Sequence, residues 1–124
     1  MRICTKNLPK SETFALASQV DIREGQVVSK TIAQNDSVSI TLFAFDQGEE
    51  LSTHTARGDA FVTVLEGKGR FTVNGVTHTL SVGESIVMPV DIPHSVFAEE
   101  SFKMLLVVVY PYEVPESGMP IRIE

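Results

Sequence analysis

The feature that most constrains this chain is an alternation of apolar and polar residues in short segments from Gly25 onward. A period of two is typical of β-strands, because successive side chains point to opposite faces. Residues 38–45 carry Val, Ile, Leu and Ala on one face and two phenylalanines among the residues of the other. This pattern predicts a strand that is buried on both faces at its C-terminal end.

Asn74-Gly75 predicts one β-hairpin directly. The pair separates two alternating runs, residues 70–73 and 76–80, and both central residues of a type I′ turn need a positive φ angle. Asn and Gly adopt that angle most readily. We therefore expect these two runs to pair as antiparallel neighbours.

The same period predicts further strands, and only residues 11–19 have helical character, with Ser11 as a possible N-cap. About eight short strands without an intervening helical pattern favour an all-β antiparallel sandwich or barrel. The other expected strands are residues 26–33, 60–66, 84–88, 94–98 and 102–110.

The length of 124 residues allows one compact domain. We divide the chain into an N-terminal extension with a short helix (1–24), a β-barrel domain (25–110) and an extended C-terminal tail (111–124). Pro111, Pro115 and Pro120 interrupt that tail, and residues 121–123 have the composition of a short edge strand.

Charge and hydropathy narrow the function classes. Ten Lys and Arg against 16 Asp and Glu leave a net charge of −6, without a basic cluster, which argues against nucleic acid and anionic membranes as partners. The longest apolar run, residues 104–110, is too short to span a bilayer, and the chain does not open on a leader pattern. Cys4 is the single cysteine and has no internal partner. We expect a cytoplasmic protein.

Two segments carry motif-like spacings: the first has Gly48, His54 and Gly67, and the second has Gly83, Pro89 and His94. These positions match G-x5-H-x-H-x3,4-E-x6-G and G-x5-P-x-G-x2-H-x3-N, so the chain resembles the cupin superfamily, which carries these paired motifs. The resemblance implies an RmlC-like jelly-roll β-barrel for the 25–110 domain, with a ligand pocket at its mouth and often a homodimer.

The departures from the motif bear on metal binding. The resemblance places the metal ligands at His54, Ala56, Ala60 and His94, so two of the four positions hold alanine. If the longer spacing of the motif applies, the position of the glutamate ligand falls on Phe61 instead of Ala60. Two neutral imidazoles without a carboxylate are a poor site for a divalent ion. We expect metal binding at His54 and His94 to be weak or absent, and no other cofactor is implied.

Strand geometry explains why the ligand positions would converge. Residues i and i+2 of a strand share a face about 6.8 Å apart, so His54 and Ala56 are expected to point together into the barrel. Ala60, on the next strand, and His94, on a distant one, would complete the cluster.

Asp59 is a further candidate catalytic residue. In a regular strand, the alternation of side chains would point Asp59 away from His54. A β-bulge at Gly58 would be needed to turn the Asp59 side chain toward it. The alternative is that Asp59 caps nearby backbone amides.

Parity also predicts an apolar cavity, with hydroxyl groups from Ser52 or Thr41, that suits a small, partly apolar or cyclic ligand. The alternative is that these side chains simply fill the barrel. The inward candidates are Phe43, Phe45, Val62, Val64, Met88, Val96 and Met104.

Three functions remain open from the sequence. The leading one is a cupin that binds a small organic molecule, with His54, His94 and Asp59 as candidates for metal-independent acid–base chemistry of the isomerase, epimerase or cyclase type. The second is a metal-dependent oxygenase or lyase with a site reduced to His54 and His94. The third is a ligand-binding or sensing module without catalysis. The expected partners are a small molecule and a second copy of the chain.

Overall fold

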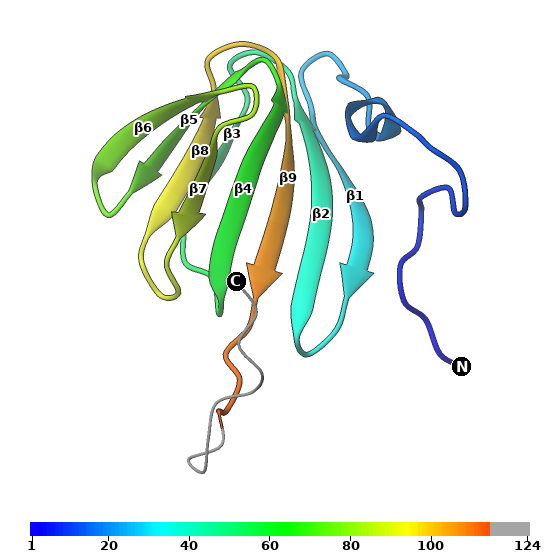
Figure 1. Ribbon diagram of the computed structural model, residues 1–124. Helices are drawn as coiled ribbons and strands as arrows, with labels where there is room; N and C mark the ends of the chain where they lie inside the picture. Colours follow the sequence, from blue (N-terminus) through cyan, green and yellow to red (C-terminus); the bar gives the residue numbers. More distant parts are fainter. Residues whose placement is uncertain (115–124) are drawn as a thin grey trace.

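The computed structural model describes residues 1–114 (Figure 1). No helix in that part of the chain is long and apolar enough to cross a membrane. The elements in order are a 3-10 turn η1 (Leu16–Gln19), then β1 (Val27–Gln34), β2 (Val38–Phe45), β3 (Glu50–His54), β4 (Asp59–Glu66), β5 (Lys68–Val73), β6 (Val76–Ser81), β7 (Ser85–Met88), β8 (His94–Ala98) and β9 (Phe102–Val109).

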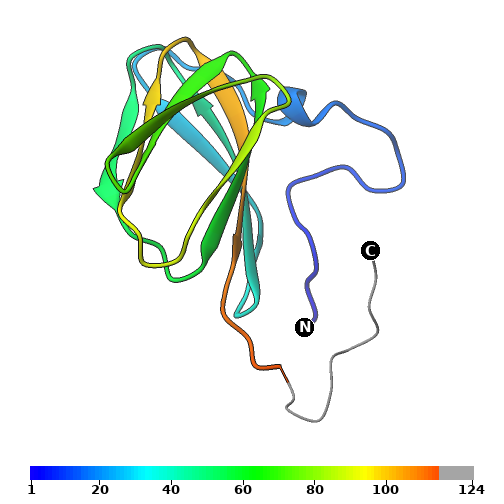
Figure 2. The same ribbon diagram turned by 60° about the vertical axis from the view of Figure 1, so that its left-hand side comes forward.

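The strands form two antiparallel sheets. One has the order β1-β2-β9-β4-β7 and the other the order β3-β8-β5-β6. The turned view shows the two sheets facing each other around a common interior (Figure 2). This arrangement confirms the predicted all-β, jelly-roll architecture.

The Asn-Gly hairpin is confirmed in detail. Asn74 and Gly75 have φ angles of 49° and 80°, and β5 and β6 pair from Val73 opposite Val76 onward. The strand expected at His54 and Ala56 has other bounds, because β3 spans Glu50–His54 and ends before Ala56. Four of its five residues are exposed, so it lacks the buried alternate positions from which strands are recognised.

The predicted helix over residues 11–19 is wrong in extent. Only the four-residue 3-10 turn η1 forms, Ser11 has a φ angle of 62° and lies outside it, and the residue at its N-terminal boundary is Ala15. Tertiary contacts hold this turn, since Lys103 Nζ donates a hydrogen bond of 2.7 Å to the carbonyl of Ala17. The expected edge strand at 121–123, together with Pro115 and Pro120, lies outside the described residues.

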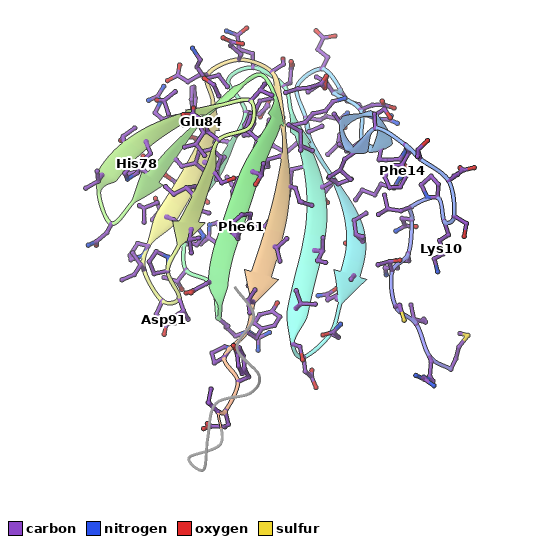
Figure 3. All side chains as sticks on the ribbon, viewed as in Figure 1. Lys10, Phe14, Phe61, His78, Glu84 and Asp91 are labelled. Atoms are coloured by element: carbon purple, nitrogen blue, oxygen red, sulfur yellow. The ribbon has the colours of Figure 1, made fainter. Side chains whose placement is uncertain are left out.

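The N-terminal segment covers part of the outer face of the five-stranded sheet. Val20 is buried there against Leu42 and Ala44, whereas Phe45 lies in the barrel interior, so β2 is buried on both faces as predicted. Farther across the same sheet, Phe61 of β4 is 41% exposed and carries its ring on the outer surface (Figure 3).

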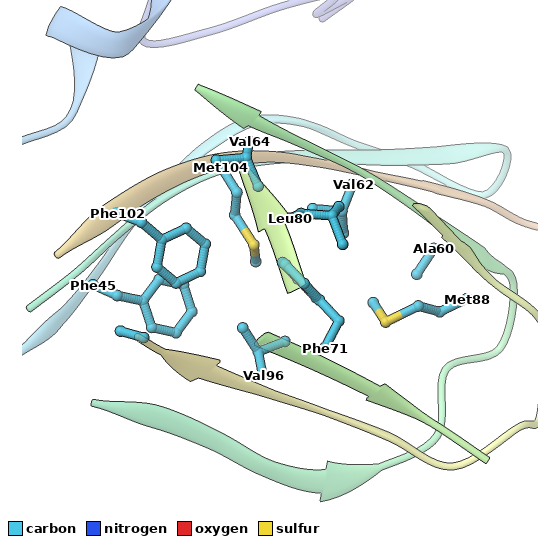
Figure 4. Packing of buried hydrophobic residues seen from close by; sticks show 11 residues of the cluster. Phe45, Ala60, Val62, Val64, Phe71, Leu80, Met88, Val96, Phe102 and Met104 are labelled. Carbon is cyan, nitrogen blue, oxygen red and sulfur yellow. The ribbon is translucent and has the colours of Figure 1, made fainter. Parts of the chain in front are cut away.

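The interior cluster is packed unevenly along the barrel (Figure 4). At one end the rings of Phe45 and Phe102 stack with centroids 4.6 Å apart, and a Cβ on Gly69 would stand 2.8 Å from the Phe102 ring. At the other end lie Ala60 and Met88, which are partners across β4 and β7. The aromatic end is therefore filled, and the smaller side chains leave space at the opposite end.

Candidate functional site

Two histidines meet at that less filled end. His54 is the last residue of β3 and His94 the first of β8, and they are direct partners in the pairing of these strands. Their ring centroids are 4.5 Å apart and the ring planes are inclined by 72°. The expectation of a distant strand for His94 is corrected here, because β8 is the hydrogen-bonded neighbour of β3.

Each imidazole is held by a backbone carbonyl two residues earlier. His54 Nδ1 lies 2.7 Å from the oxygen of Ser52, and His94 Nδ1 lies 3.2 Å from the oxygen of Ile92. A carbonyl oxygen can only accept, so both Nδ1 atoms donate. In the neutral ring the proton then resides on Nδ1, and Nε2 carries a free lone pair.

The two rings differ in their access to water. His94 is only 3% exposed, whereas His54 lies at the exposed end of its strand. Burial lowers the pKa of His94, the nearby His54 lowers it further, and the hydrogen bond to the Ile92 carbonyl opposes these effects. The neutral form of His94 is thus favoured.

Both histidines line one cavity of about 100 Å³. Ala56 and Ala60 lie in the same wall, as the family motif predicts for its other two ligand positions. Three of the expected inward residues, Met88, Val96 and Met104, contribute as well. The remaining lining residues are Leu51, Leu106 and Val108.

Several details of the predicted site need correction. Because β3 ends at His54, Ala56 does not reach the cavity through the i, i+2 geometry of a strand. The hydroxyl groups of Ser52 and Thr41 are not among the lining groups, and Ser52 instead offers its carbonyl to His54. Sequence reasoning missed Leu51, because the strand expected at His54 and Ala56 was not extended back to the residues before His54.

Leu106 and Val108 were missed for a different reason. They belong to a continuous apolar run in β9, where alternation gives no indication of which face is inward. Strand pairing decides that both side chains face inward. Leu106 pairs with Val62 and Val108 pairs with Ala60, and Val62 and Ala60 belong to the interior cluster.

Asp59 is not brought to the histidines. It is exposed, its Oδ1 accepts a hydrogen bond of 2.9 Å from the amide of Val90, and it lines a separate hollow of about 300 Å³. Gly58 does not turn it inward, since this glycine is packed against the backbone of Val109. The carboxylate therefore acts as an amide cap.

Another hollow also lies apart from the histidines. It measures about 350 Å³ and is lined by Arg57 and Tyr110, with the guanidinium carbon 5.5 Å from the ring centroid of the tyrosine. Neither histidine reaches it. The smaller cavity, beside His54 and His94, combines two imidazole nitrogens that can accept a proton with an apolar wall. We therefore take it as the candidate functional site.

The residues of the cavity do not fit the divalent metal that the family motif implies. Its nitrogen donors are two neutral imidazoles, and alanines stand at the other two ligand positions. Within residues 1–114, no group of three or more His, Cys, Asp or Glu side chains is placed to hold a metal ion. A divalent ion here would lack the anionic ligand that offsets its desolvation.

Comparison with known proteins bears on the whole domain. A family model described as cupin domain matches residues 41–110. A conserved protein of unknown function from Streptococcus pyogenes is 38% identical, with a TM-score of 0.87 over 90% of this chain and 98% of that chain. A cupin superfamily protein from Desulfitobacterium hafniense DCB-2 is 32% identical, with a TM-score of 0.84 over 88% of this chain and 100% of that chain.

A cupin 2 conserved barrel domain protein from Leptotrichia buccalis is 46% identical, with a TM-score of 0.76 over 77% of this chain and 47% of that chain. No curated protein matches the chain.

Proposed function

The chain belongs to the cupin superfamily, and on that premise we propose that it binds a small organic molecule in the cavity beside His54 and His94. The observation that carries the proposal is the shared cavity of the two imidazoles and two alanines. Ala56 and Ala60 leave space directly beside the only ring nitrogens of the wall. A few placed polar groups in an apolar pocket are the usual composition of a ligand site.

The cavity volume limits how much of the ligand enters. An apolar cavity of about 150 Å³ accepts benzene, and the volume here is about 100 Å³. Met88 and Met104 line it with unbranched, adaptable side chains. A ring of the size of benzene therefore enters fully only when these two methionines shift, and the rest of the ligand stays at the mouth near exposed His54.

The same geometry supports metal-independent acid–base chemistry as the reaction type. An Nε2 lone pair held in place by a hydrogen bond at Nδ1 can accept a proton from a bound molecule and return it to a neighbouring atom. Isomerisation, epimerisation and cyclisation are reactions of this kind. A binding or sensing role uses the same contacts without proton transfer.

Two matched variants test the binding proposal. Benzene added to the protein should shift the assigned methyl signals of Ala56 and Ala60 in NMR spectra. Ala60→Leu fills the cavity and should abolish these shifts at Ala56. Phe61→Leu alters the next residue on the outer face and should leave them intact. Absence of any shift in the parent protein would reject the proposal.

Metal content distinguishes the proposed metal-independent site from the metal-dependent alternative. Protein purified without a histidine tag should contain well below one equivalent of any transition metal by elemental analysis. A stoichiometric metal that is lost in His54→Phe would instead favour the reduced metal site.

A further inference from the structure

The chemistry of the cavity also restricts the kind of ligand. The restriction comes from which ring nitrogens are already used. Both Nδ1 atoms donate to backbone carbonyls, so in the neutral pair each Nε2 can act only as an acceptor. The other lining residues are alanine, leucine, valine and methionine, which bring no hydrogen-bond donor from their side chains.

His94 lines the cavity with one of its two ring nitrogens already engaged. Within residues 1–114, no buried side-chain nitrogen or oxygen lacks a hydrogen-bond partner. His94 uses Nδ1 for its hydrogen bond to the Ile92 carbonyl, so Nε2 is the ring nitrogen that is left for a ligand. His94 as a residue is only 3% exposed and lines the cavity, so a ligand in the cavity meets its ring.

We propose, on the basis of the proposed binding function, that the ligand is a small neutral molecule that donates a hydrogen bond from a hydroxyl group to the imidazole pair. An acceptor-only wall cannot pair with a carboxylate or a phosphate, and burying such an anion without a donor is costly. A neutral hydroxyl group donates a hydrogen bond to Nε2 without the cost of burying a charge.

The methionines favour an aromatic body for this ligand. Met88 and Met104 face the cavity from β7 and β9, and thioether sulfur makes favourable contacts with aromatic rings. Phenol therefore combines the two features that the wall selects. Anisole has a similar shape without the donor, and benzoate replaces the donor by a charge.

The test compares these three probes at pH 8, which is above the ordinary histidine pKa of about 6.5. Affinities come from NMR titration of the Ala56 and Ala60 methyl signals. Phenol should bind about five- to tenfold more tightly than anisole, the ratio expected for one hydrogen bond. Benzoate should bind more weakly than either.

Variants locate the acceptor. His94→Phe keeps a ring and removes Nε2, so the ratio of phenol to anisole affinity should fall to near one. His54→Phe, at the exposed end of β3, repeats the test if the first variant does not fold. His78→Phe changes an exposed histidine on β6, outside the cavity, and should leave the ratio unchanged.

The remaining outcomes overturn the inference in distinguishable ways. Equal binding of phenol and anisole would show that no acceptor is used, while the binding function would stand. Tightest binding of benzoate would show that the site presents donors. If none of the three probes shifts the alanine signals, the proposed binding function fails as well.

Discussion

Asp46 and Ser101, which are 55 residues apart in the chain, are joined by a hydrogen bond of 3.1 Å from the serine hydroxyl to Oδ1. The same carboxylate accepts the amide of Gly25 at 2.8 Å and the amide of Gln47 at 3.0 Å. It therefore ties the start of β1 to the end of β2 and to the loop before β9. The hydrogen bonds from Gly25 and Ser101 lower the pKa of Asp46.

Loss of the Asp46 charge should weaken the fold in a pH-dependent way. Because the pKa of Asp46 in the folded protein lies below the ordinary aspartate value of 3.8, the carboxylate stabilises the protein above pH 3.8 and loses this effect as the pH falls through the folded pKa. Asp46→Asn should lower the melting temperature at pH 7, with a difference that shrinks toward pH 2. Asp36→Asn, in the β1–β2 turn, is the control. A difference independent of pH would contradict the linkage.

His94 should titrate below the ordinary range. Its pKa is lowered from 6.5 by burial and by His54, so the unfolded chain binds this proton more readily. Folding stability should therefore fall as the pH drops below about 6.5, until it passes the folded pKa. NMR titration of the His94 Cε1 proton should give a lower midpoint than the same signal in urea. An equal or higher midpoint would show that the ring is not desolvated.

Restoring the two missing ligands should create a metal site. Ala56→His combined with Ala60→Glu adds an imidazole and a carboxylate to the wall that holds His54 and His94. Overpacking typically costs about 1–3 kcal/mol, so the readout is a rise in melting temperature on adding Ni²⁺, Mn²⁺ or Zn²⁺. Ala56→Asn with Ala60→Gln adds similar bulk without these ligands and should show a much smaller rise. A folded ligand-bearing variant without metal response would contradict the assigned geometry.

Two motif glycines should differ in their tolerance to alanine. Gly67 and Gly83 both have positive φ angles, of 72° and 85°. A Cβ on Gly83 meets nothing within 4 Å, whereas one on Gly67 would collide with the backbone around Ser101 and Phe102. Gly83→Ala should cost about 1–2 kcal/mol, and Gly67→Ala clearly more. Urea unfolding measures both, and equal losses would refute the close contact.

A homodimer remains an expectation, and the sheet indicates which face it would use. Val87, Phe61 and Val107 are partners in one row across β7, β4 and β9, and Phe61 and Val87 are 41% and 48% exposed. An apolar row of this kind favours association with a second copy. Sedimentation should show a dimer at micromolar concentration, and Phe61→Glu should convert it to a monomer. A monomeric parent protein would reject the expectation.

Local chemistry accounts for the parts of the fold that were predictable. Asn74-Gly75 determined its hairpin because the φ angles of two adjacent residues suffice for the turn. Alternation located most strands, since the side-chain period depends on the chain alone. It did not give the bounds of β3, whose residues are mostly exposed, and the helix expected at 11–19 is replaced by a four-residue turn that packs on the sheet.

The spacing of His54 and His94 in the sequence was enough to predict that both histidines belong to one site. Their direct contact, however, is a property of the tertiary structure. Register between β3 and β8 places the rings 4.5 Å apart, and the enclosing wall decides that His94 is buried while His54 is open. Asp59 shows the same dependence, because its carboxylate is committed to Val90, 31 residues away. Strand pairing and burial are non-local, so the sequence determined which side chains were available, and only the folded barrel decided which of them share a cavity.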